Sequence, residues 1–209
     1  MKLFSYVVDH DNGFAPNPFY NYCTLAHCKY TRKKSKRRGM IEMIQDNYIR
    51  DKEIWILGTG GKSKKSTGNG TIIYLMKLTE QPLTLEEYYE DKRFNNKIPR
   101  NNGDDINALG DNLKNYEKNE HGIQRYVLIS EEYYYFGSNA IKIPDLFIKG
   151  GIEKKYSGYK CTFNNDIDHK FINWITNKYK NNYGMYGFPT TLNKVDKNYK
   201  QKLKRLRNC

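Results

Sequence analysis

Short apolar runs separated by glycine- and asparagine-rich stretches dominate the hydrophobic pattern of this chain. Residues 2–9 mix β-branched and aromatic side chains in partial alternation, which predicts an opening strand. Residues 53–59 and 71–79 are nearly continuous apolar runs, and they predict two buried strands that pair as a hairpin with a long loop. Two further strands are predicted at residues 124–130 and 133–136.

The clearest helical periodicity lies in residues 166–178. There the apolar side chains of Ile167, Phe171, Trp174 and Ile175 follow each other at the spacing of one helix face. A capping box, Thr84-x-x-Glu87, predicts a second, short helix. Three segments are less regular: a short helix or inserted arm at residues 40–49, one or two helical turns at 23–29, and a strand or turn at 143–148.

The composition is that of a globular domain with a modest core. Of the 209 residues, 38% are hydrophobic, but 19 Tyr and 9 Phe supply large side chains that pack while keeping a polar edge. The polar stretch at residues 95–121 exceeds the usual loop length and is therefore functional or disordered. We predict one α+β domain over residues 1–193, followed by a basic tail over residues 194–209.

The net charge of +13 favours polyanionic partners and makes any such binding sensitive to salt. An AT-rich genome would also enrich Lys, Asn, Ile and Tyr, which weakens this inference. The chain has no apolar run of about 18 residues, so we expect no membrane partner. The N-terminus lacks the features of a signal peptide, and four cysteines without such a signal predict reduced thiols in the cytoplasm.

The segment from Asp11 to Lys29 is unlike ordinary core sequence. Two prolines restrict its backbone, and Phe14 and Phe19 give it large apolar side chains. Seven Lys or Arg follow within residues 29–38. This combination predicts a rigid pocket beside a surface that attracts anions. The alternative is a packed connection followed by a solvated charge run.

A loop rich in Gly, Ser and Lys, GTGGKSKKSTGNG, follows the second predicted strand. It lacks the spacing of a phosphate-binding P-loop, and a strand rather than a helix comes next, so NTP hydrolysis is not expected. Lys64 and Lys65 in this loop are predicted to grip a nucleic-acid backbone, or else the loop is simply solvated.

Metal-binding and catalytic patterns are weak. Cys23, His27 and Cys28 lack the spacing of a zinc site, so neither a metal nor a cofactor is predicted. Asp11 follows a strand end, where a general base would fit, and Cys23 or Cys28 beside basic residues would suit a nucleophile. The competing interpretation makes Asp11 a turn acceptor and the cysteines core residues, which is the role we favour for the thiols.

Seven segments occur in an order typical of one known family: SYVVDHDNGFAPNPFYNYCTLAHCK, WILGTG, IIYLMKLTE, LEEYYEDKRF, LGDN, RYVLISEEYYYFG and IP. Over about residues 2–189 the chain resembles the second nucleotide-modification-associated domain family, found in phages and bacteria near DNA-modification genes. The chain departs from the family pattern after Lys29 and carries an insertion between Arg38 and Trp55. The basic run is therefore a feature of this chain rather than of the family.

The order of the strands is also similar to that of the EVE and ASCH domains, which are PUA-like barrels that bind nucleic acids. This resemblance implies a small curved mixed sheet or a PUA-like barrel with a few flanking helices. It agrees with the number of strands read from the hydrophobic pattern.

These observations predict binding of nucleic acid, or of a modified base or nucleotide, in a pocket. The pocket would be formed by the FAPNPF loop, residues 14–19, and the GTG strand end, residues 58–60. The predicted ligand contacts are Phe14, Asn17, Phe19, Gly58, Thr59, Gly60, Asp111 and Asn112. The predicted phosphate contacts are Lys29, Arg32, Arg37, Arg38, Lys64 and Lys65. Two alternatives remain: an enzyme that modifies a base or nucleotide, with Asp11, Cys23 or Cys28 as catalytic residues, and a protein that sequesters a nucleotide signal.

Overall fold

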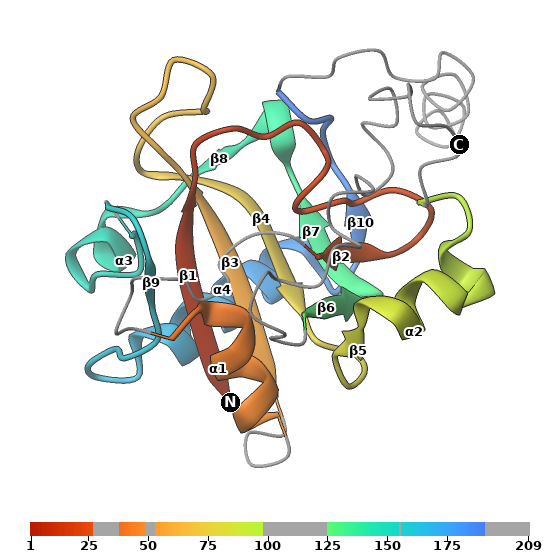
Figure 1. Cartoon of the computed structure of the whole chain (residues 1–209). Helices are drawn as coiled ribbons and strands as arrows, with labels where there is room; N and C mark the ends of the chain where they lie inside the picture. The colour runs from red at the N-terminus through yellow and green to blue at the C-terminus, as the bar shows by residue number, and fades with distance from the viewer. Residues whose placement is uncertain (27–37, 49–52, 98–124, 155, 191–209) are drawn as a thin grey trace.

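The computed structural model describes residues 1–26, 38–48, 53–97, 125–154 and 156–190 (Figure 1). Their centre is a mixed sheet whose strands, in sheet order, are β10 (Gly184–Met185), β7 (Glu132–Tyr135), β4 (Thr71–Lys77), β3 (Ile54–Gly60), β1 (Lys2–Val8) and β9 (Tyr159–Lys160), with β8 (Ile141–Lys142) paired to β4. Strand β1 runs parallel to β3, and β3 forms the predicted antiparallel hairpin with β4. The α+β class and the mixed sheet are confirmed.

The sheet stays open in the part of the chain that the structure describes, so the alternative of a PUA-like barrel is wrong. Its two edges are the two-residue strands β9 and β10, which pair with β1 and β7 and not with each other. A separate three-stranded sheet has the order β2 (Cys23–Leu25), β6 (Tyr126–Ser130) and β5 (Leu83–Thr84).

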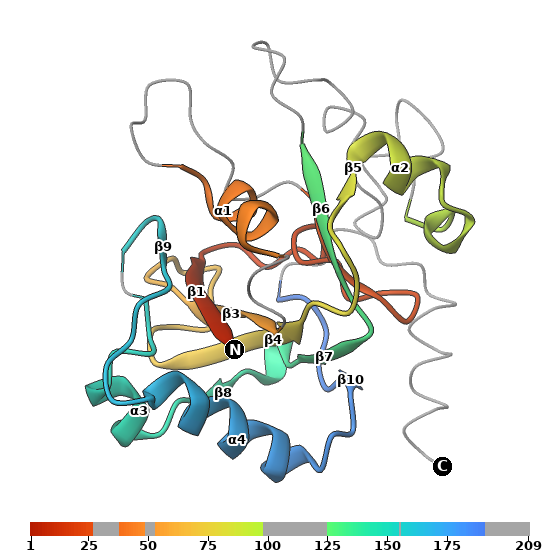
Figure 2. The ribbon, with the colours of Figure 1, turned by 90° about the horizontal axis from the view of Figure 1, so that it is seen from below.

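Layers of helix cover both faces of the main sheet (Figure 2). Side chains alternate along β3, so Trp55 and Leu57 pack under α3 (Asp145–Lys149) and α4 (Ile167–Tyr179). Ile54 and Ile56 point to the other face, which packs against α1 (Met40–Asn47) and the second sheet. Helix α2 (Leu85–Glu90) packs on the far side of that second sheet.

Several predicted elements are confirmed in detail. Helix α4 buries Ile167, Phe171 and Ile175, as the apolar periodicity requires. Helix α2 begins with the predicted capping box, because the Glu87 amide donates to Thr84 Oγ1 at 3.1 Å and the Thr84 amide donates to Glu87 Oε2 at 2.7 Å. All seven residues of β3 are buried, as its continuous apolar run indicates.

Two local predictions are wrong. Residues 23–25 form β2 rather than a helical turn, because pairing with β6 buries the side chains of Cys23 and Leu25. The predicted strand or turn at residues 143–148 is mostly helix α3. Pro144 caps that helix with a φ of −56°, and a proline has no N–H with which to extend a strand. Residues 191–209, including the predicted tail, lie outside the described residues. The domain boundary at residue 193 therefore stays a prediction.

Two short 3₁₀ helices complete the described elements: η1 (Lys92–Phe94), which follows α2, and η3 (Gly137–Asn139), which follows β7.

Candidate nucleic-acid interface

The FAPNPF loop and the glycine-rich loop leave the same end of the main sheet (Figure 1). Parallel pairing places the last residue of β1, Val8, opposite the last residue of β3, Gly60. Ser66 Oγ then ties the glycine-rich loop to the end of β1, because it donates to Val8 O at 2.9 Å and accepts from the Gly61 amide at 2.7 Å. The two loops therefore start side by side.

A third segment joins them from near the end of the described chain. Thr190 Oγ1 lies 3.1 Å from both Asp11 O and Lys65 O. A Cβ placed on Gly13 would lie 2.6 Å from Pro189 Cγ, and the φ of Gly13 is +75°. Gly13 therefore both makes the turn and allows the close approach of this segment.

The centre of the FAPNPF loop faces the protein interior. Asn17 and Phe19 are 0% exposed, whereas Phe14 is half-buried. The backbone of Asn17 exchanges hydrogen bonds with Thr24, and its side-chain Oδ1 accepts from the Phe19 amide at 3.2 Å. In this arrangement Asn17 shapes the loop, and Phe14 is the loop aromatic that reaches the surface.

Lys97, which the sequence analysis did not single out, holds the loop from inside. It is 0% exposed. Its ammonium donates to Asn17 O at 2.9 Å and Tyr22 O at 2.8 Å, and it lies 3.0 Å from Asn17 Oδ1. A lone lysine in a polar, asparagine-rich segment gives no sequence signal for such a role.

Asp11 and Tyr135 form a buried acid–phenol pair under the loop. Asp11 is 1% exposed, and its Oδ1 accepts a hydrogen bond from the Tyr135 hydroxyl. Burial raises the pKa of Asp11 to about 6, although hydrogen bonds from Tyr135 and Thr190 oppose the shift. This carboxyl group therefore takes up a proton as the pH falls through about 6.

Cys23 lies near this pair and is 0% exposed. Burial raises the pKa of its thiol to about 12, and the positive charge of Lys97 opposes that shift only in part. A thiol with such a pKa stays protonated at neutral pH, so it lacks the thiolate that a nucleophilic mechanism needs.

The glycines of the GTG strand end are packed closely against neighbouring residues. A Cβ on Gly58 would lie 2.2 Å from Tyr74 Cε1, and a Cβ on Gly60 would lie 2.0 Å from Gly68 O. Thr59 is buried, and its hydroxyl lies 3.2 Å from Tyr6 O and 3.4 Å from Lys154 O. The motif thus lets the glycine-rich loop and the segment around Lys154 pack onto the sheet.

An exposed aromatic side chain flanked by cations lies beside this strand end. Tyr156 is 70% exposed. The ammonium groups of Lys62 and Lys154 lie 5.7 and 5.8 Å from its ring centroid, within cation–π range. Lys64 and Lys65 are exposed on the same loop as Lys62. Lys64 and Lys65 were among the predicted contacts but Tyr156 was not, although it directly follows two lysines in the sequence.

Among known families, the model of nucleotide modification associated domain 2 matches residues 1–126 and 113–196. The chain belongs to this family. The resemblance inferred from the sequence motifs is therefore confirmed, and membership in nucleotide modification associated domain 2 gives the chain a nucleotide-modification context. No curated protein and no solved structure matches the chain.

The nucleotide modification associated domain 2 match includes predicted contacts that the structure leaves undescribed. Cys28, Lys29, Arg32, Arg37, Asp111 and Asn112 lie outside the described residues. Arg38 is described and exposed, and it forms an ion pair with Asp46. Within the described ranges, no three His, Cys, Asp or Glu side chains gather as a metal site would require, and no helix is long and apolar enough to cross a membrane.

Proposed function

We propose that this chain binds nucleic acid, in the DNA-modification context of its family, at the sheet end where the FAPNPF and glycine-rich loops meet. The observation that carries the proposal is Tyr156, an exposed ring with two lysine ammonium groups 5.7 and 5.8 Å from its centroid. Such a ring offers a stacking face for an unpaired base, and the lysines offer charge to the adjacent phosphates.

The surrounding charge supports a polyanion as the ligand. Lys62, Lys64 and Lys65 are exposed on one loop, and the whole chain carries a net charge of +13. Lysine contacts with phosphates supply affinity without reading sequence, whereas a base on Tyr156 requires a single strand or a base flipped out of a duplex. We therefore favour single-stranded over double-stranded ligands.

The buried residues of the FAPNPF loop have a supporting part in this proposal. Asn17 and Phe19 are buried and hold the loop, so the ligand contact from the FAPNPF loop is Phe14. The protonated, buried thiol of Cys23 supports binding rather than covalent chemistry. Asp11 is engaged by Tyr135 and Thr190, which supports a structural part for its carboxylate.

The first test is stacking on Tyr156. Tyr156→Ala is expected to weaken binding of a fluorescent single-stranded oligonucleotide about 5- to 150-fold, since stacking contributes about 1–3 kcal/mol per base. Tyr156→Phe should keep most of the affinity. Leu146→Ala is a matched control, because Leu146 is 65% exposed and lies on α3. Fluorescence anisotropy measures all four proteins, and wild-type affinity in Tyr156→Ala would refute the stacking site.

The second test is the salt dependence of binding. Replacing Lys62, Lys64 and Lys65 together with Gln should reduce the slope of log affinity against log salt by about 2, because each lysine contact with a phosphate of a single strand contributes about 0.7 to that slope. The control replaces three other exposed lysines, Lys92, Lys149 and Lys170, with Gln, which changes the net charge equally. If both triple variants change the slope alike, the loop makes no specific phosphate contacts.

A further inference from the structure

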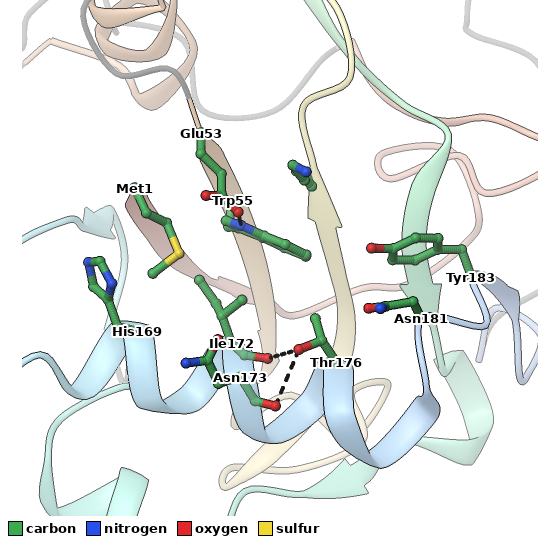
Figure 3. A pocket seen from close by; sticks show the side chains of 10 residues that line it. Met1, Glu53, Trp55, His169, Ile172, Asn173, Thr176, Asn181 and Tyr183 are labelled. Atoms are coloured by element: carbon green, nitrogen blue, oxygen red, sulfur yellow. Dashed lines mark hydrogen bonds between the residues drawn. The ribbon is translucent and has the colours of Figure 1, made fainter.

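A surface pocket lies at the other end of the main sheet, under helix α4 (Figure 3). Its volume is about 490 Å³, within the range typical of small-molecule sites. It is lined from the sheet by Trp55 and Lys77, which pair across β3 and β4 at the end where β1 begins. The pocket is therefore separate from the surface around Tyr156.

The inner wall of the pocket is apolar and rigid. Trp55 and Ile172 border it and are only 2% and 3% exposed, so each is fixed by the core behind it. The ring of Tyr183 lines another side and is held by Tyr134, whose ring centroid lies 5.0 Å away. Two aromatic side chains and one branched aliphatic side chain back a pocket whose exposed surface is mostly polar, which suits a flat ligand with hydrogen-bonding edges.

One carboxylate oxygen in the pocket is positioned to accept a hydrogen bond. The Trp55 indole N–H donates to Glu53 Oε1 at 2.9 Å, which fixes the carboxylate. Within the described residues, Glu53 Oε2 makes no hydrogen bond. In Figure 3, Glu53 and Trp55 lie together at the wall opposite α4.

Two amides face the same space from α4 and the segment after it. Asn173 and Asn181 line the pocket and are exposed. Neither side-chain amide hydrogen-bonds to another residue in the part of the chain that the structure describes. A side-chain amide offers one acceptor and one donor group in a plane, which matches the edge of a heteroaromatic ring.

The charged groups of the β3 and β4 wall favour a ligand that donates hydrogen bonds. The ammonium of Lys77 is already paired with Glu132 Oε2 at 3.2 Å. Glu53 contributes a negative charge to the lining. A ligand group that donates hydrogen bonds would therefore be accepted by Glu53, whereas Lys77 is already paired.

We infer that this pocket binds a neutral, planar heteroaromatic ring with an exocyclic amino group, as in adenine or cytosine. Glu53 Oε2 accepts from the amino group, and Asn173 or Asn181 pairs with the adjacent ring nitrogen. The inner wall of Trp55, Ile172 and Tyr183 contacts the ring. This site goes beyond the proposed nucleic-acid interface and does not depend on it.

Tryptophan fluorescence tests the inference, because the chain has two tryptophans and only Trp55 lines the pocket. In a Trp174→Phe background, Trp55 is the sole tryptophan, and excitation at a wavelength that tyrosine does not absorb isolates its emission. Adenosine or cytidine should change its emission saturably and bind at least about tenfold more tightly than uridine, which presents a carbonyl in place of the amine. Saturation-transfer NMR on the wild-type protein gives the same comparison without the Trp174 substitution.

Glu53→Gln sharpens the test. Gln keeps the acceptor for Trp55 but replaces the second oxygen with an N–H₂ donor, so the preference should shift from the amino-bearing nucleosides toward uridine, by about tenfold or more. Replacing both Asn173 and Asn181 with Ala should weaken binding, whereas Asn177→Ala, one turn further along α4 and outside the pocket, should not.

Three results would overturn the inference: no saturable signal with any nucleoside, equal affinity for uridine in the wild type, or an unchanged preference in Glu53→Gln. None of them bears on the oligonucleotide site. The Tyr156 variants should bind the nucleosides normally, and Glu53→Gln should bind the oligonucleotide normally.

Discussion

Lys97→Met is expected to lower the free energy of unfolding by about 2–5 kcal/mol, because it leaves buried acceptors without their donor. Lys97 is 0% exposed, and its ammonium is the donor to Tyr22 O at 2.8 Å and to Asn17 O at 2.9 Å. Methionine matches the length of the side chain but supplies no hydrogen bond. Urea unfolding followed by circular dichroism measures the loss.

Lys92→Met is the matched control for this prediction. Lys92 lies five residues earlier, in η1, and is exposed. The same substitution there should change the unfolding free energy by no more than about 0.5 kcal/mol. If Lys97→Met is as stable as Lys92→Met, the buried ammonium does not hold the FAPNPF loop in place.

The sequence predicted most of the central sheet because its strands carry strong local signals. The continuous apolar run that became β3 has every residue buried between two layers, and the run that became β4 pairs with it as the predicted hairpin. The helix α4 follows from its periodicity, and α2 from its capping box. These elements are encoded by residues close to each other in the sequence.

The wrong predictions involve residues whose partners are distant in the sequence. Residues 23–25 became a strand because β6, about a hundred residues later, was available to pair with them. Likewise, the pattern of strands suggested a barrel, but β2, β5 and β6 form their own sheet, and nothing local shows that. Propensity gives way to tertiary pairing in such short segments.

Some features of the candidate site likewise follow from local sequence, and others depend on contacts between distant residues. The FAPNPF loop and the GTG strand end belong to the same end of the sheet, because β1 and β3 are parallel neighbours, while the pocket predicted between them stays a prediction. It could not show that Asn17 and Phe19 point inward, or that Lys97 lies beside them, because burial depends on the packing of the whole loop. Tyr156 meets Lys62 from another loop, nearly a hundred residues earlier, so their contact is also a tertiary feature.

The buried carboxyl group of Asp11 makes stability depend on pH. Its pKa is raised by burial from the ordinary value of 3.8 to about 6 in the folded protein. A group with a raised folded pKa stabilises the fold fully below its unfolded pKa, and this contribution is lost as the pH rises through 6. The Asp11→Asn variant has no carboxyl group at this position, so its stability does not change through this titration. The stability of this variant relative to wild type should therefore rise by about 2 kcal/mol between about pH 4.5 and 7.5.

Tyr135→Phe separates the carboxyl group from its hydrogen-bond donor. Because the Tyr135 hydroxyl lowers the pKa of Asp11, its removal should move the titration of Asp11 upward, as seen by carbon-detected NMR of the carboxyl group. The pH range in which Asp11 loses its contribution to folding stability should move upward together with its pKa. A constant stability difference between Asp11→Asn and wild type across this range would contradict the raised pKa.

The same variant also separates binding from chemistry. If Asp11 is structural, as its bonds to Tyr135 and Thr190 indicate, Asp11→Asn should bind the oligonucleotide like wild type once both proteins are compared at a pH where both are folded. A variant that folds normally but no longer binds, or that loses a base-modifying activity present in wild type, would place the carboxylate at the ligand. That outcome would favour the enzyme over the binding protein, because Asp11 would then be a group with a pKa suited to general-base catalysis.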